Sequence, residues 1–173
     1  MKLNKFSFLP AAVFGLFLTV SAFAQTSTFI DPSVDYSFDL PNPMWKMTAK
    51  PSVTSPNVEY TFGDRSAGYL DVRKLTVKAD DVMSDTIAGE EEKLKFLQGY
   101  VAGKEENFAG NLKGRVFNYE FIRSGRNMSG RFYFLKATPT TVYVLRFTAQ
   151  KEKLITIRNQ TDSIARTFAV KKP

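Results

Sequence analysis

Three segments of alternating apolar residues between positions 113 and 150 constrain this fold more than any other feature of the sequence. Two turn signals separate them. Gly125-Arg126 suits a two-residue hairpin loop with glycine at the first central position, and Pro139-Thr140 suits a second tight turn. The pattern therefore predicts a three-stranded antiparallel β-meander.

These two loops fix a register, because a hairpin turn determines which residues face each other. Phe117 is expected opposite Phe134, Phe134 opposite Leu145, and Phe132 opposite Phe147. A surface of this size and apolarity must be covered by at least one helix. The residues expected on this face are Phe117, Tyr119, Phe121, Phe132, Phe134, Tyr143, Leu145 and Phe147. A register shift of one residue would divide them between the two faces of the sheet.

The opposite face of the meander carries the candidate binding residues. In this register Glu120 lies directly opposite Arg131, and Tyr133 lies beside Arg146. Two interpretations are open. The face is either partly solvated, with a cross-strand ion pair contributing ~0–1 kcal/mol, or a shallow polar groove that receives a ligand or partner. The candidate partner-binding set is Asn118, Glu120, Arg131, Tyr133 and Arg146.

The segments before the meander predict further strands. Residues 35–40 alternate strictly and are typical of a half-buried strand, and residues 25–33 are expected to be a flexible lead-in. Residues 58–62 and 69–77 predict a hairpin that turns through residues 63–68. Trp45, the single tryptophan, is interpreted as a core residue rather than a ligand platform.

Two segments have helical periodicity. The first runs from about Asp81 to Phe108, with Asp81, Ser84 or Asp85 as the N-cap, although three glycines weaken it by ~1 kcal/mol each relative to alanine. Its apolar stripe is Ile87, Leu94, Leu97, Val101 and Phe108. The second helix follows the last strand, with Leu154, Ile157, Ile164 and Phe168 on its apolar stripe and Thr161 between them.

The N-terminus predicts export. Lys2 and Lys5 precede an uncharged, mostly apolar run over residues 6–20, and Ala22-Phe-Ala24 matches a signal-peptidase site. The expected products are a signal peptide, residues 1–24, and one globular domain, residues 34–173. The mature protein would be periplasmic or extracellular, with no membrane span after cleavage. An uncleaved anchor is disfavoured, because the apolar run is shorter than the ~20 residues needed to span a bilayer.

Charge is distributed unevenly along the chain. Residues 25–110 contain 9 Lys and Arg against 14 Asp and Glu, whereas residues 111–173 contain 13 against 3. The second part is therefore strongly basic and could meet an acidic protein or another anionic surface.

The sequence lacks the residues that several kinds of catalytic and metal site require. The chain has no histidine and no cysteine, which excludes Ser-His-Asp and Cys-His nucleophile systems, histidine-ligated metals and disulfides. No phosphate-binding glycine motif occurs, and the segment around Gly130 lacks the aromatic pattern of an RNA-binding strand. We therefore expect no enzyme activity, no cofactor, no metal site and no nucleic-acid partner. Sequons at Asn127 and Asn159 would be used only in a eukaryotic secretory pathway.

The order of these features resembles the PsbP-like superfamily. The shared features are Tyr36-x-Phe38-x-x-Pro41 followed by Trp45, a central helix, a meander ending in Val142 to Thr148, and a last helix that closes with Thr167-Phe-Ala-Val170. This superfamily includes the PsbP subunit of photosystem II, a Ran-binding nuclear-import factor and small exported bacterial proteins. The resemblance implies an α+β fold, in which an antiparallel sheet is sandwiched between helices (α/β/α). It also implies a non-catalytic accessory role.

Two functions remain open. The first is an accessory protein that docks on a protein or anionic partner through the polar face of the meander. In that case, reversing Arg131 and Arg146 to glutamate is expected to abolish capture with little change in stability. The second is a carrier of a small apolar or amphiphilic ligand, held between the aromatic sheet face and the first helix.

Overall fold

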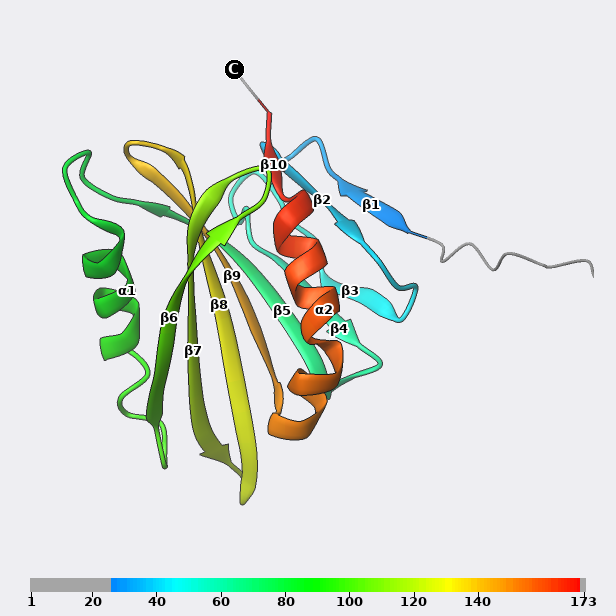
Figure 1. The fold of residues 1–173 in the computed structure, drawn as a ribbon. Coiled ribbons are helices and arrows are strands. Elements are labelled where there is room, and N and C mark those ends of the chain that lie inside the picture. The colour runs from blue at the N-terminus through cyan, green and yellow to red at the C-terminus, as the bar shows by residue number, and fades with distance from the viewer. Residues whose placement is uncertain (1–25, 172–173) are drawn as a thin grey trace, which may run out of the picture.

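The computed structural model describes residues 26–171, so the signal peptide expected over residues 1–24 lies outside the described residues. The structure is α+β, with two antiparallel sheets and two helices (Figure 1), which confirms the predicted class. The large sheet has the order β3-β4-β5-β9-β8-β7-β6, and a small sheet has the order β1-β2-β10. The elements are β1 (Ser27–Ile30), β2 (Tyr36–Leu40), β3 (Trp45–Ala49), β4 (Val58–Phe62), β5 (Asp64–Thr76), α1 (Met83–Glu92), β6 (Val101–Ala109), β7 (Lys113–Arg123), β8 (Arg126–Thr138), β9 (Thr141–Gln150), α2 (Lys151–Thr167) and β10 (Ala169–Val170).

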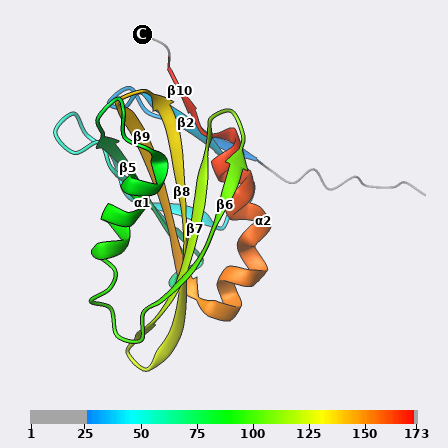
Figure 2. The same cartoon turned by 60° about the vertical axis from the view of Figure 1, so that its left-hand side comes forward.

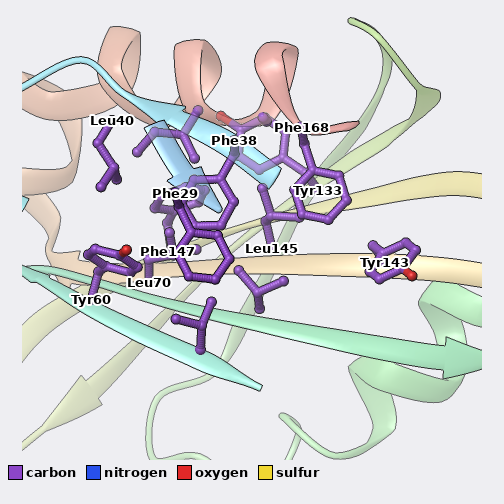
Figure 3. Close-up of a cluster of buried hydrophobic side chains, with 14 of the residues drawn as sticks. Phe29, Phe38, Leu40, Tyr60, Leu70, Tyr133, Tyr143, Leu145, Phe147 and Phe168 are labelled. Atoms are coloured by element: carbon purple, nitrogen blue, oxygen red, sulfur yellow. The ribbon is translucent and has the colours of Figure 1, made fainter. Parts of the chain in front are cut away.

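The two helices lie on opposite sides of the large sheet (Figures 1 and 2). Helix α1 packs through Ile87 on a cluster around Phe132 and Phe134. Helix α2 packs through Leu154 and Ile164 on a second cluster, which we show in Figure 3. The expected sandwich is met in part, because α2 shares its layer with the small sheet. Residues 27–30, within the expected lead-in, form strand β1 of that sheet.

The meander β7-β8-β9 is present, but its first turn lies one residue earlier than predicted. Ser124 and Gly125 occupy the loop with φ of 51° and 72°, as a type I′ turn requires at both central positions. Consequently Phe117 pairs with Phe132, and Tyr119 pairs with Gly130. The predicted loop at Gly125-Arg126 was therefore wrong, although the β7 residues keep their predicted face, because the pairing moves by two.

The second turn changes which face each β9 residue occupies. A β-bulge between Lys136 and Thr138 shifts the register by one residue, so that Phe132 pairs with Arg146 and Phe134 with Val144. The predicted pairs of Phe134 with Leu145 and of Phe132 with Phe147 were wrong. The predicted apolar face is therefore divided. Tyr143, Leu145 and Phe147 lie in the α2-side cluster, and Phe117, Tyr119, Phe121, Phe132 and Phe134 lie in the α1-side cluster.

The first helix is shorter than its periodicity predicted. It ends at Glu92, and the chain then turns through Gly99, whose φ is +61°. Residues 101–109 form the edge strand β6 instead of a helix, with Val101 59% exposed. The predicted side-chain cap is also absent, because Val82 occupies the N-cap and the Asp81 carboxylate accepts a hydrogen bond from the Lys78 amide.

Other strand and helix predictions agree with the structure. Strand β2 buries alternate residues, β4 and β5 form a hairpin, and α2 buries the stripe expected of the second helix. The predicted turn over residues 63–68 was too long, because β5 begins at Asp64 and only Gly63 separates the two strands. Trp45 is buried against Phe62 and Phe147, and its indole N–H donates to Gln160 Oε1 at 3.1 Å. The prediction that Trp45 is a core residue is confirmed.

None of the helices within residues 26–171 has both the length and the apolarity that a membrane crossing needs.

Candidate functional site

Arg131 is the centre of a polar network between β8 and α2. It is 5% exposed, although charged residues are seldom buried without partners. Its Nη1 donates to Asn118 Oδ1 at 2.8 Å, its Nη2 to Asp162 Oδ1 at 2.9 Å, and its Nε to the Tyr133 hydroxyl at 2.7 Å. These acceptors come from β7, α2 and β8, so the network joins the meander to the C-terminal helix.

The Tyr133 hydroxyl completes the same network. It donates to Asp162 Oδ1, and Thr161 Oγ1 lies 2.8 Å away. Burial raises the pKa of Tyr133, and the Asp162 carboxylate acts in the same direction, while the Arg131 charge opposes them. The phenol therefore stays protonated at neutral pH and serves as a hydrogen-bond donor.

A groove of about 380 Å³ opens beside this network. We call it the α2–β6 groove, because it runs between edge strand β6 and the N-terminal half of α2. Buried Arg131 forms part of its floor, and the exposed apolar side chains of Val101 and Ile155 lie at its edges. Its charged lining residues are Glu106, Glu120, Arg131, Lys151 and Arg158.

Ion pairs cross the α2–β6 groove. Lys151 Nζ lies 2.8 Å from Glu120 Oε1, and Arg158 Nη2 lies 3.8 Å from Glu106 Oε2. Lys151 and Arg158 are about half exposed, with side-chain exposures of 46% and 56%. Solvated pairs of this kind contribute ~0–1 kcal/mol, so a ligand carboxylate could exchange with them at little cost.

The structure places the five predicted site residues in three environments. Asn118, Glu120 and Arg131 line the α2–β6 groove, and Tyr133 is buried behind it. Arg146 lies on the opposite face of the sheet, where its guanidinium packs 4.7 Å from the Phe132 ring. The bulge in β8 accounts for this separation, because it turns each β9 side chain to the other face.

Two predicted contacts, Glu120 with Arg131 and Tyr133 with Arg146, were wrong. Tyr133 pairs with Leu145, and Arg146 pairs with Phe132. Glu120 pairs across the strands with Ser129 and forms its ion pair with Lys151, while Arg131 lies opposite Asn118. Helix α2 covers Arg131 and Tyr133 on the polar face, whereas Glu120 stays half exposed. Charge reversal at Arg131 would therefore bury a carboxylate beside Asp162, so the expectation of unchanged stability does not hold for that position.

The missed site residues lie on α2. Lys151, Ile155, Arg158 and Asp162 are spaced by four, three and four residues and share one side of the helix. This spacing is visible in the sequence, but the helix was interpreted from its apolar stripe alone, so its polar side was not considered as part of the site. Within residues 26–171, no group of three or more acidic side chains is arranged to hold a metal ion.

No protein-family model and no curated protein matches the sequence. Solved structures do match. The Ran-binding protein Mog1p of Saccharomyces cerevisiae has a TM-score of 0.62 at 11% identity, over 85% of this chain and 96% of its own. The cyanobacterial PsbP of Synechocystis has a TM-score of 0.56 at 13% identity, over 87% of this chain and 95% of its own. The chain has the PsbP-like fold.

A third structure, a Pseudomonas aeruginosa protein of unknown function, has a TM-score of 0.56 at 14% identity over 86% of this chain and 98% of its own. The structural likeness establishes the PsbP-like fold. At identities this low it says nothing about function, which must be argued from the site itself. Within this PsbP-like fold, the α2–β6 groove is formed by the last helix and the edge of the large sheet.

Proposed function

We propose that this protein is an exported, non-catalytic accessory protein that docks on a partner protein through the α2–β6 groove. One observation carries the proposal. The groove combines exposed apolar side chains, Val101 and Ile155, with half-exposed Lys151 and Arg158 above the rigidly held Arg131. Apolar contact area beside arginine is typical of protein-binding surfaces.

The partner expected here is an extended segment that carries acidic side chains. Strand β6 is at the edge of the large sheet, and an extended segment can pair with such an edge through its main chain. The basic balance of residues 111–173 favours an acidic partner. Its carboxylates would replace Glu120 and Glu106 as partners of Lys151 and Arg158.

A photo-crosslinking amino acid at Ile155 tests the docking site. With benzoylphenylalanine there, in the full chain expressed in its own host, we expect a discrete crosslinked adduct whose partner is identified by mass spectrometry. The control position is Phe96, which is 92% exposed and lies outside the groove. Identical adducts from both positions, or none from Ile155, would contradict docking in the groove.

Charge reversal in the groove then tests the electrostatic part of the proposal. We expect K151E/R158E to reduce formation of the Ile155 adduct at least tenfold, because both positive charges that would meet the partner are reversed. The melting temperature should change little, since both side chains are half exposed. The matched control is K113E/K136E, which reverses two exposed lysines paired across β7 and β8. An equal loss in both variants would indicate an effect of net charge alone.

Export has its own test. We expect the secreted protein to begin at Gln25, since Ala22-Phe-Ala24 precedes it and Lys2, Lys5 and the apolar run stand upstream. The intact mass of the protein recovered outside the cytoplasm measures this directly. A recovered chain that still begins at Met1 would indicate an anchor or a cytoplasmic protein.

A further inference from the structure

A second hollow lies on the α1 side of the large sheet, on the opposite face from the α2–β6 groove. Its volume is about 340 Å³, close to the lower limit for small-molecule sites. We call it the arginine pocket. Strands β5, β7 and β9 form its floor, and the turn that follows α1 covers one side with Leu94 and Leu97. Phe132 and Phe134 on this side of the sheet are fully buried. A separate, more open hollow of about 590 Å³ lies between α1 and the end of β5, lined by Leu75, Asp85 and Gly89 among others.

The bulge in β8 brings Arg146 into this pocket. Its side chain is 22% exposed, and its guanidinium lies against the Phe132 ring. The nearest carboxylate oxygen is Asp71 Oδ2, 3.9 Å from Nη1, which is beyond hydrogen-bond distance. A guanidinium has five N–H donors in a fork that matches a carboxylate or phosphate. The Arg146 guanidinium is thus largely buried without a bidentate protein acceptor among the described residues.

The pocket carries a surplus of positive charge. Asp71 is the one acidic residue in its lining, and its Oδ2 accepts a 2.7 Å hydrogen bond from Arg73 Nε. Arg123 and Arg146 belong to the same lining, which therefore holds more guanidinium groups than carboxylates. The two other basic lining residues, Lys93 and Arg65, have ion-pair partners outside the lining, Glu90 and Glu59.

Aromatic side chains give the pocket an apolar wall. Tyr119 and Phe121 stack on the floor with ring centroids 5.7 Å apart, and the Arg123 guanidinium lies 5.1 Å from the Phe121 ring. Burial raises the pKa of Tyr119 to about 12, against the opposing effect of the Arg146 and Arg123 charges. Its hydroxyl is therefore a neutral donor at physiological pH, and it adds no negative charge to the site.

We propose that the arginine pocket binds a small organic anion with an aromatic or short apolar body. The carboxylate or phosphate of the ligand pairs with Arg146 and is assisted by Arg123. The body of the ligand lies between Tyr119 and the side chains of Leu94 and Leu97. This inference is independent of the docking groove, because the two sites share only Tyr119 and lie on opposite faces of the sheet.

A set of small probes tests the charge and the body of the ligand separately. The purified protein is titrated with benzoate, phenyl phosphate, inorganic phosphate and benzamide, and the amide NMR signals are followed. We expect benzoate or phenyl phosphate to shift the amide signals of Arg146, Thr148 and Asp71. The dissociation constant should be at least tenfold lower than that of benzamide, which has the same ring without the charge. Inorganic phosphate should bind more weakly than phenyl phosphate. Equal affinity for benzamide and benzoate would overturn the proposal.

Three variants identify the residues responsible. Arg146→Met keeps the aliphatic stem on Phe132 and is expected to weaken the tighter anion at least tenfold. Asp71→Asn removes the competing carboxylate and is expected to tighten binding several-fold. Arg158→Met loses the same charge in the α2–β6 groove and should bind the anion like the unmodified protein. Arg123→Met, at an exposed position, repeats the test if Arg146→Met fails to fold. Unchanged binding by the folded variant would overturn the assignment.

Discussion

Replacing Asp162 with alanine is expected to lower the free energy of unfolding by ~3 kcal/mol. The change removes the carboxylate that faces Nη2 and Nε of Arg131, and it leaves that guanidinium 5% exposed with Asn118 and Tyr133 as its hydrogen-bonding partners. Breaking a buried ion pair costs more than the pair contributes, because the buried charge loses its close partner. The other carboxylate near Arg131, that of Glu106, lies 4.0 Å from Nη1 and is half exposed. Urea unfolding of the purified protein measures the loss.

Two further variants separate charge from packing. Asp162→Asn keeps an acceptor oxygen near Arg131 and should lose less stability than Asp162→Ala. Arg131→Met combined with Asp162→Ala removes both charges, and we expect this double variant to be more stable than Asp162→Ala alone. If the double variant loses the sum of the two single losses, the network contributes no coupling and the buried charge is not the cause.

Strand β2, the β4–β5 hairpin, the meander and α2 could be predicted from the sequence, because alternation, helical periodicity and turn residues are local signals. Strands β1, β3, β6 and β10 were not predicted. The family resemblance added the prediction of an antiparallel sheet sandwiched between helices. The structures of Mog1p and PsbP support that fold.

The faces of the meander could not be predicted with the same certainty, because one inserted residue changes them. Two turn types at Pro139-Thr140 gave the same register, and neither contained the bulge between Lys136 and Thr138. Apolar residues occupy both faces of β9 over residues 142–145, so its pattern alone did not expose the error. Arg146 was therefore placed in the wrong site.

The end of the first helix was missed for a similar reason. Leu94 and Leu97 continue the apolar stripe of α1 and do contact the core, but they do so from a turn. The three glycines predicted only a weak helix. In the structure α1 ends at Glu92, and Gly99, with its left-handed φ, then turns the chain so that residues 101–109 pair with β7. Pairing over nine residues outweighed the helical periodicity, because tertiary contacts commonly override local propensity.

The second large effect is expected at Phe168, which is fully buried where α2 ends. Its ring lies 5.3 Å from that of Tyr36 in the small sheet and 5.2 Å from that of Tyr143 in the large sheet. Phe168→Ala should therefore lower the free energy of unfolding by ~4 kcal/mol, through lost burial and the cavity left behind. Urea unfolding measures this loss, with Phe96→Ala as the exposed control, for which the change should stay within ~0.5 kcal/mol.

The position of Phe168 also predicts which strands lose the most stability in Phe168→Ala. The ring connects the small sheet to the large one, and the Lys171 amide beside it donates a 2.7 Å hydrogen bond to the Asp35 carbonyl. In Phe168→Ala, amide hydrogen exchange should therefore accelerate more in β2 and β10 than in β7 and β8. Uniform acceleration across both sheets would contradict a local connecting role, and it would indicate that the small sheet and the meander unfold as one cooperative unit.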